Sequence, residues 1–473
     1  MRILLIKTYE EGFTLRYGPP LGLLYIASSI RSAFKDEVEV KILDPRPSKM
    51  TVDEIVEYVC EKTPDMIGTS SLTCEAPMLY KLIKKIKANK PAINVITGGP
   101  HADAAPREIL ECSPADFAVT GEGEKTIVEL IKSKIEGSSF NDVKGICYRS
   151  NGKILLNPKR EFIDDIDNIS FPAWDLIKIE DYNKMGTHPF ILKFERWMPI
   201  LTSRACPYQC TYCHNIFGKK PRLRSPQNVV KEMQILFEDY GIREIQFMDD
   251  MFNFDIERAK IICDLIVEKK LDFALCFPNG LRGDRIDEEL VKKLKNAGAY
   301  FIAYAFESAS ERIQKMIKKR LNVEKTKKAV QFTSKYNILT YGFFMLGFPT
   351  ETIEEINATI DLACSTKLHM ATFPQVLPFP GTELFKQAIE IFPDYKKHFD
   401  EMDFETDESF YSLYTNVDLK KIQSKAYRKF YFKPSRLIKM FILFPRKKVL
   451  FIQALTLLRY FFRFWDKFTK KNK

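Results

Sequence analysis

The chain has 473 residues, of which 45% are hydrophobic and 13% aromatic, so it can bury the cores of two or three domains and is not a disordered protein. Seven of its ten cysteines are scattered singly, which does not fit a disulfide framework and favours a reducing cytoplasm. The apolar run at Met1 to Lys7 is too short for a secretory signal and is typical of a first strand.

The net charge of +11 is concentrated near the C-terminus. Residues 433–473 contain twelve Lys or Arg and one acidic residue, Asp466, so the rest of the chain is neutral. Aromatic and apolar residues alternate with these basic ones, and the longest uncharged run, Val449 to Leu458, is ten residues and too short to span a bilayer. Two interpretations stay open: a basic amphipathic segment on an anionic membrane surface, or a helical pair packed on the body with a solvated basic face.

Residues 1 to about 135 alternate apolar strand patterns with helical patterns. We expect strands at 3–7, 38–43, 66–70, 95–97 and 117–120, and helices near 21–34, 52–62, 76–88, 105–112 and 124–135. Five such units predict a Rossmann-like, doubly wound parallel α/β sheet. Ligands of these sheets bind outside the carboxyl ends of the strands, where this chain gathers small and polar residues.

A hairpin around Asn151-Gly152 and an acidic connector follow. Strand patterns then recur at 198–203, 244–249, 273–278, 300–306, 340–346 and 371–377, which predicts a partial (β/α)6 barrel with its chemistry at the strand ends. The predicted domains are the Rossmann-like domain at 1–145, the hairpin and linker at 146–195, the barrel at 196–390, and a helical, basic amphipathic region at 391–473.

Three cysteines are spaced C-x3-C-x2-C at Cys206, Cys210 and Cys213. Three thiolates in one loop can bind three corners of a 4Fe-4S cubane, which leaves one iron free to bind a substrate or a cofactor. The alternatives are a zinc site, in which the adjacent His214 would be the fourth ligand, or three unrelated cysteines.

The segment from Ser203 to Pro207, followed by Cys210 and by Tyr212 just before Cys213, resembles the signature of radical S-adenosylmethionine (radical SAM) enzymes. In that family the open iron chelates the amino and carboxylate groups of SAM, and one electron from a reductant such as flavodoxin or ferredoxin cleaves SAM to a 5'-deoxyadenosyl radical. The resemblance implies this chemistry here.

The same resemblance implies further SAM-binding residues at the ends of the barrel strands. Asp249 and Asp250 correspond to the place that contacts the SAM amino group, although either could instead only cap a helix. Glu307 and Ser308 resemble the ribose-contacting segment, and Arg282 could bind a carboxylate of SAM or of the substrate.

The first domain also resembles cobalamin-binding domains. Four of its residues match the Ser-x-Leu and Gly-Gly parts of the cobalamin fingerprint: Ser70, Leu72, Gly98 and Gly99. In the remaining part Asp44 is present, but Arg46 replaces the cobalt-ligating His and Lys49 the Gly, which implies cobalamin bound without a histidine ligand (His-off). Glu122, in Gly121-Glu122-Gly123-Glu124, also looks like this subgroup. His101 is either a cobalt ligand or a hydrogen-bonding loop residue, and a Rossmann-like relic that binds nothing is the alternative for the domain.

These resemblances imply a cobalamin-dependent radical SAM enzyme that modifies an unactivated carbon by methyl transfer. Related enzymes use the same parts for oxidative cyclisation, ring contraction or other rearrangements. The alternative from a different functional class is a non-catalytic iron-sulfur or cobalamin-binding protein. We expect a small, hydrophobic substrate such as a lipid or tetrapyrrole. Nucleic acid is not favoured, because Cys60, Cys74 and Cys112 are too dispersed to form the second cysteine triad of RNA methylthiolating enzymes.

Overall fold

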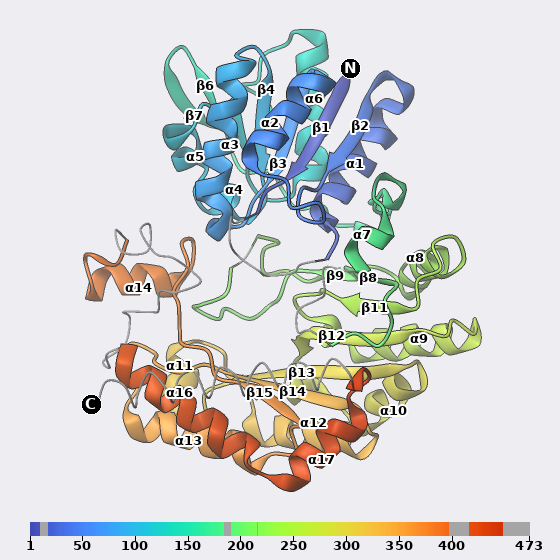
Figure 1. Cartoon of the computed structure of the whole chain (residues 1–473), viewed down its shortest axis with the longest axis vertical. Coiled ribbons are helices and arrows are strands. Elements are labelled where there is room, and N and C mark those ends of the chain that lie inside the picture. The colour runs from blue at the N-terminus through green and yellow to red at the C-terminus, as the bar shows by residue number, and fades with distance from the viewer. Residues whose placement is uncertain (10–17, 184–190, 215, 397–415, 448–473) are drawn as a thin grey trace.

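The computed structural model describes residues 1–9, 18–183, 191–214, 216–396 and 416–447. Figure 1 shows two α/β units, one above the other, with the last helices of the described chain on the outside of the lower unit. Residues 448–473, which include the uncharged run from Val449 to Leu458, lie outside the described residues. No helix within the described ranges combines the length and apolarity that a bilayer span requires.

The first unit is a seven-stranded sheet in the order β2-β1-β3-β4-β5-β6-β7. Five strands are parallel: β1 (Arg2–Lys7), β2 (Glu39–Leu43), β3 (Met66–Ser70), β4 (Asn94–Gly98) and β5 (Phe117–Val119). The predicted hairpin, β6 (Ile146–Ser150) and β7 (Lys153–Leu156), pairs antiparallel along the β5 edge and extends this sheet. The doubly wound prediction is therefore confirmed.

Helices cover both faces of the first sheet. One face is covered by α1 (Leu21–Phe34) and α6 (Gly123–Glu136), and the other by α2 (Val52–Lys62), α3 (Ala76–Asn89) and α5 (Pro106–Cys112), with the short α4 (Pro100–Ala104) at the end of β4. Helix α2 begins where sequence reasoning placed it, because the Thr51 hydroxyl accepts from the N–H of Glu54 while the Glu54 carboxylate accepts from the N–H of Thr51.

The second unit is a six-stranded parallel sheet in the order β15-β14-β13-β12-β11-β8. Its strands are β8 (Trp197–Ile200), β11 (Glu244–Phe247), β12 (Ala274–Leu281), β13 (Ala299–Glu307), β14 (Leu339–Phe344) and β15 (Met370–Thr372). The helices that follow them are α8 (Pro226–Glu238), α9 (Ile256–Glu268), α10 (Glu288–Asn296), α11 (Glu311–Met316), α12 (Val323–Lys335) and α13 (Ile353–Ser365). Together with α14 (Glu383–Ile391), which follows β15, they complete six strand-helix units and confirm the partial barrel.

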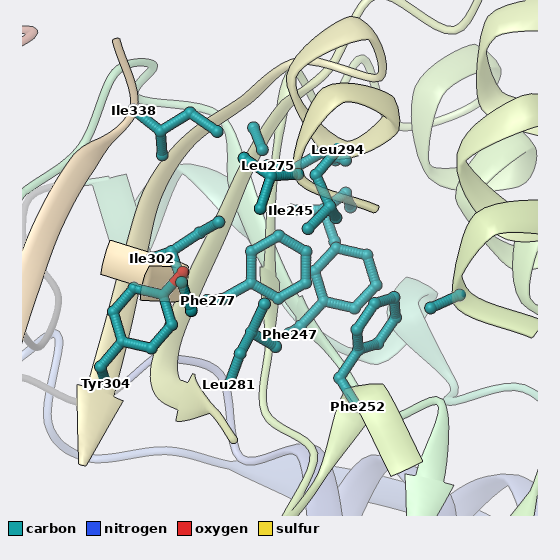
Figure 2. Close-up of a cluster of buried hydrophobic side chains, with 14 of the residues drawn as sticks. Ile245, Phe247, Phe252, Leu275, Phe277, Leu281, Leu294, Ile302, Tyr304 and Ile338 are labelled. Carbon is teal, nitrogen blue, oxygen red and sulfur yellow. The ribbon is translucent and has the colours of Figure 1, made fainter. Parts of the chain in front are cut away.

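Aromatic side chains fill much of the barrel core (Figure 2). The rings of Phe247 and Phe277, on neighbouring strands, stack with centroids 4.6 Å apart, and Phe252 packs edge-on to Phe247 at 4.8 Å. This rigid layer supports the carboxyl ends of β11 and β12.

The remaining helices are α7 (Ile179–Asn183) in the connector, α16 (Asn416–Tyr431) and α17 (Pro434–Leu443). Helix α16 packs on the barrel, where the Tyr431 hydroxyl donates to the carbonyl of Ala371 and accepts from its N–H. Helix α17 is held at its start by the buried Arg436, which donates to the carbonyls of Leu368 and Cys364. Of the basic region 433–473, the described residues include α17, most of which is exposed, so the predicted helical pair of that region stays a prediction.

Candidate active site

The three cysteines lie in one loop, residues 205–221, at the carboxyl end of the barrel sheet. The loop leaves β9 (Ser203–Arg204) and returns on β10 (Arg222–Leu223), and these short strands pair antiparallel at its base. Cys206 and Cys210 are half-buried and Cys213 is exposed. The loop therefore presents its thiols beside the strand ends.

Backbone and side-chain contacts hold this loop on several sides. The N–H of Thr211 donates to the carbonyl of Ile317 at 3.0 Å, and its own carbonyl accepts from the N–H of Leu384 at 2.8 Å. The Arg282 guanidinium lies over the Tyr208 ring, 3.5 Å from its centroid. Asp284 binds Arg282 through both carboxylate oxygens, so Arg282 faces the loop in a fixed orientation.

The surroundings of the loop act differently on its three thiols: burial raises the pKa of Cys206, and the hydrogen bond to Cys210 raises the pKa of Cys213. A hydrogen bond from the Cys213 thiol lowers the pKa of Cys210 to about 6, and the Lys319 ammonium acts in the same direction. Among the described residues, no three His, Cys, Asp or Glu side chains are close enough to hold a single metal ion. A cubane places different demands on the loop, because each thiolate binds a separate iron.

Two non-glycine residues beside the cysteines adopt left-handed backbone conformations. Ala205, immediately before Cys206, has φ of +75°, and Glu307, at the end of β13, has φ of +64°. Such conformations cost about 1 kcal/mol or more for a residue with a Cβ and cluster at functional sites. The left-handed conformation at Glu307 coincides with a bulge in the pairing of β13 with β14. The Glu307 side chain there accepts a hydrogen bond from the Tyr212 hydroxyl.

Glu307, Tyr212 and Lys319 form a buried polar cluster at the edge of the cysteine loop. Lys319 donates to the Glu307 carboxylate and to the Tyr212 hydroxyl, each at 3.0 Å, and that hydroxyl donates to the same carboxylate at 3.1 Å. Sequence reasoning named Tyr212 and Glu307 as candidate site residues but missed Lys319, because Lys318-Lys319-Arg320 has the pattern of an exposed basic run.

Asp249 and Asp250 occupy different environments at the end of β11. One Asp249 oxygen accepts from the Thr202 N–H and hydroxyl and from the Ser203 hydroxyl, at 3.1, 2.7 and 2.5 Å. Its second oxygen is buried without a hydrogen-bond partner among the described residues, and burial raises the pKa of the group. Asp250 is exposed and accepts from the N–H of Ala205, so both carboxylates support the start of the cysteine loop.

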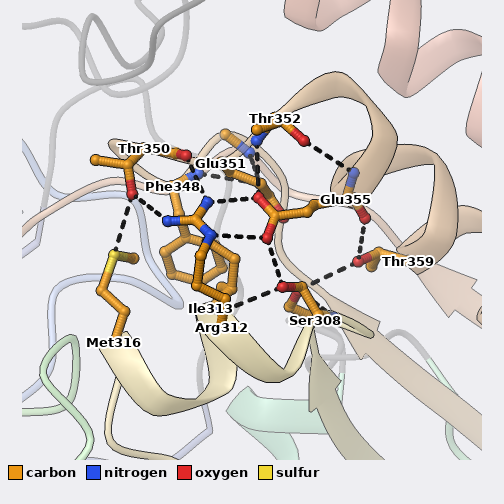
Figure 3. Close-up of polar contacts among 12 residues, drawn as sticks. Ser308, Arg312, Ile313, Met316, Phe348, Thr350, Glu351, Thr352, Glu355 and Thr359 are labelled. Atoms are coloured by element: carbon orange, nitrogen blue, oxygen red, sulfur yellow. Dashed lines mark hydrogen bonds and ion pairs between the residues drawn. The ribbon is translucent and has the colours of Figure 1, made fainter.

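Ser308 is fully buried where β13 leads toward α11 (Figure 3). Its hydroxyl lies 3.3 Å from that of Thr359 and accepts from the N–H of Ser310, next to the Arg312–Glu355 ion pair. Ser308 therefore fixes the segment that carries Glu307.

Two cavities at the junction of the units share Gly22, Leu23 and Ser70. One, of about 250 Å³, is lined by both units: Lys7, Arg46, Ser70 and Leu72 from the first, and Trp197, Pro199, Gln246 and Met248 from the second. The other, of about 270 Å³, extends beneath α1 and α6 and is lined by Gly98, Gly99, Gly121, Glu122 and Phe217 among others. A more open cavity of about 700 Å³, outside α1 and α6, contains none of the three cysteines.

The glycines at these cavities leave room that side chains would fill. A Cβ on Gly22 or Gly121 would meet nothing within 4 Å. Gly99 has φ of +90°, and a Cβ there would lie 2.7 Å from the Ser70 hydroxyl, so this turn requires glycine.

Asp44 and Arg46 form a buried pair at the same junction. The Asp44 carboxylate binds Arg46 through both oxygens and accepts from the Tyr182 hydroxyl at 3.0 Å. The Arg46 Nη1 is buried and finds no hydrogen-bond partner among the described residues. This donor borders the 250 Å³ cavity, and an amide-rich ligand would satisfy it.

His101 has a hydrogen-bond partner at only one ring nitrogen among the described residues, because its Nδ1 is buried without one. Its Nε2 lies 2.8 Å from the Tyr80 hydroxyl, and burial lowers its pKa to about 4, so the ring is neutral. The Nε2 contact is the one expected of a hydrogen-bonding loop residue, and the role of His101 stays a prediction.

The Pro380-Gly381-Thr382 turn lies between the two units. Gly381 has φ of +85°, and a Cβ there would approach Ala104 at 3.1 Å and His214 at 3.3 Å. The turn thus touches α4 of the first unit and the residue after Cys213, which explains why glycine is needed.

Comparison with known families gives matches to both units. The radical SAM superfamily model matches residues 200–363, and the B12 binding domain model matches residues 15–131. An uncharacterized methyltransferase of Pyrococcus horikoshii is 33% identical over 455 residues, covering 93% of this chain and 94% of the relative. The chain belongs to the radical SAM superfamily and carries a B12-binding domain.

Two further similarities agree with this assignment. The cytidylyl-2-hydroxyethylphosphonate methyltransferase of Streptomyces wedmorensis is 30% identical over 420 residues, which are 78% of each chain. The structure of the radical SAM methyltransferase TsrM from Kitasatospora setae, with cobalamin and a [4Fe-4S] cluster bound, has a TM-score of 0.67 at 20% identity and covers 82% of this chain and 75% of that one. The cofactors of this radical SAM enzyme are accordingly a 4Fe-4S cluster, SAM and cobalamin.

The described residues fit these groups. The loop offers three thiols to the cluster, and the glycine-lined cavities with the unsatisfied Arg46 Nη1 offer space and a donor to cobalamin. SAM would lie between the cysteine loop and the strand ends that carry Asp249, Asp250, Arg282 and Glu307.

Filling the shared wall of the two cavities should block cobalamin. We expect Gly22→Leu to weaken cobalamin binding by at least about tenfold, because forcing a side chain into a filled site costs about 1–3 kcal/mol. The smaller Gly22→Ala should weaken it less. Absorbance titration of the full-length protein with hydroxocobalamin measures this.

The control is the midpoint temperature of thermal unfolding without cobalamin. Neither substitution should lower this temperature, because glycine is a poorer helix former than alanine or leucine at this position of α1. Unchanged cobalamin affinity in Gly22→Leu would contradict the placement.

Proposed function

We propose that this enzyme transfers a methyl group to an unactivated carbon of a small, largely hydrophobic molecule. The observation that carries the proposal is the shared cavity at the junction: residues that end β1 and β3 of the B12-binding domain and residues of β8 and β11 of the barrel line one space of about 250 Å³. Lys7 and Ser70 are the last residues of β1 and β3, and Met248 directly follows β11, so these strands direct their carboxyl ends to the cavity, as strands at the ligand sites of such sheets do.

The protein's contribution is to bind, orient and exclude water. When bound, the cluster and SAM supply a 5'-deoxyadenosyl radical after one-electron reduction, and methylcobalamin supplies the methyl group. The cysteine loop would anchor the cluster, and Glu307 and Asp250 offer acceptors for the ribose hydroxyls and the ammonium of SAM. The junction would keep these groups together and away from solvent, so that a radical meets its target before it is quenched.

Removing the thiols should abolish SAM cleavage. We expect the triple variant Cys206→Ala, Cys210→Ala, Cys213→Ala to lose its bound iron and to release no 5'-deoxyadenosine when reduced flavodoxin or dithionite and SAM are supplied anaerobically. The wild type should produce both 5'-deoxyadenosine and S-adenosylhomocysteine, the second from methylation of cobalamin by SAM. Chromatography with mass detection measures both products.

The matched control is Cys112→Ala, which removes an exposed cysteine far along the chain from the loop and should leave iron and both products unchanged. SAM cleavage by the triple variant would refute the site. Formation of 5'-deoxyadenosine without any S-adenosylhomocysteine by the wild type would refute methyl transfer and favour cyclisation or rearrangement.

We further propose that the enzyme reaches its hydrophobic substrate at an anionic membrane surface. Five apolar side chains on and before α17 are exposed: Phe432, Leu437, Ile438, Phe441 and Ile442. The sequence from 433 onward carries the whole excess of positive charge, which complements anionic lipid. An exposed apolar strip next to basic residues is the pattern of an interfacial helix.

Introducing charge into this strip should prevent lipid binding. We expect Ile438→Glu with Ile442→Glu to reduce co-sedimentation with phosphatidylglycerol vesicles by at least about tenfold, since burying a charge in lipid offsets the apolar gain. The control Ile261→Glu with Val267→Glu changes two comparably exposed residues of α9 and should bind as the wild type does. Equal binding by both double variants would remove the membrane proposal.

A further inference from the structure

A buried ion cluster joins the B12-binding domain to the base of the cysteine loop. Arg204 and Arg222 both donate to the Glu122 carboxylate, at 2.8 and 2.7 Å, and Arg204 donates to Glu124 at 2.5 Å. These side chains expose 10% or less of their surface. Glu122 ends the turn between β5 and α6 and Glu124 lies in the first turn of α6, some 80 to 100 residues earlier in the chain.

The two arginines stand at the two ends of the loop. Arg204 is the last residue of β9 and Arg222 the first of β10, and they are direct partners in the antiparallel pairing that closes the loop. Like charges directly opposite on paired strands are destabilising. The base of the loop therefore needs a counter-ion to close, and this counter-ion comes from the other domain.

The connector and the cavity meet at the same carboxylate. The second Glu122 oxygen accepts from the Ile163 N–H at 2.7 Å, and Arg222 also donates to the carbonyl of Phe217 at 2.8 Å. The Arg204 guanidinium lies 5.1 Å from the centre of the Phe217 ring, and Phe217 lines the 270 Å³ cavity together with Glu122. Loop, connector and cavity are thus fixed to one another through Glu122.

We propose that Glu122 is a positioning residue that closes the base of the cluster loop, so that a stable cluster forms only when the B12-binding domain is docked. In this role Glu122 acts through Arg204 and Arg222, although it also lines the 270 Å³ cavity that offers space to cobalamin. Both of its carboxylate oxygens already accept hydrogen bonds from protein donors, which favours the positioning role. The competing explanation is direct cobalamin binding, which the sequence resemblance implied. The inference needs the cluster but not the proposed methyl transfer.

The test is iron release from the anaerobically reconstituted full-length protein to a ferrous chelator. Glu122→Gln should speed release by about tenfold or more, because removing one partner of a buried ion pair leaves charge uncompensated. Glu122→Gln with Arg222→Met restores the balance of charge, one arginine facing Glu124, and should return the rate to within about twofold of the wild type. Glu124→Gln, which leaves Glu122 in place, should have an intermediate effect and serves if Glu122→Gln fails to fold.

The exposed Arg31–Asp175 ion pair provides the control, and Asp175→Asn should leave iron release unchanged. Cobalamin affinity, measured in parallel, separates the two explanations. Rescue of cluster retention by Arg222→Met supports positioning. Unchanged iron release in Glu122→Gln, or a loss of cobalamin affinity that Arg222→Met does not rescue, would overturn it in favour of cobalamin binding. Neither result depends on a methylated product.

Discussion

The structure depends on one constraint: the loop that carries the three thiols must keep a shape that can bind a cluster, and contacts with other parts of the chain hold it in place. Its base is closed by two facing arginines whose charge is compensated by Glu122 and Glu124 of the other domain. Its middle is fixed at Thr211 by α11 and α14. Buried ion pairs of this kind add little net stability, because desolvation offsets the attraction, but they specify one arrangement of their partners.

The same arrangement brings the two halves of the chemistry together. Each sheet ends in a loop region rich in small or polar residues, and the two regions face one another across the junction cavities. The turn at Gly381 contacts Ala104 and His214 and so touches both units beside the cysteines. Positive φ at Ala205 and Glu307 shows that local backbone preference gives way here to the geometry of the site.

Much of the fold follows from local pattern. Helices α1 and α2 begin and end where the apolar periodicity predicts, and all six barrel strands lie within a few residues of their expected positions. The three cysteines could also be singled out from the sequence, because their spacing is local. The predicted 105–112 helix is observed as α5, whereas the additional short helix α4 before it and the addition of the hairpin to the sheet depend on packing that no local window contains.

The side-chain contacts that organise the site could not be predicted from local sequence patterns. Glu122 and Arg222 are 100 residues apart, and nothing in the sequence around either one pairs them. Lys319 stands in a basic run, and only the fold shows that it turns inward to Glu307 while its neighbour Lys318 turns outward to Glu383. Partner choice among charged residues is a property of the folded molecule, whereas strand and helix periodicity is a property of the segment.

The metal content of the full-length protein, purified without oxygen and reconstituted with iron, sulfide and hydroxocobalamin, tests the central claim most directly. The account predicts about four iron atoms and about one cobalt atom per chain, because three thiolates support one cubane and one junction accommodates one cobalamin. A single zinc ion in place of the iron, or a protein that retains neither metal, would contradict it.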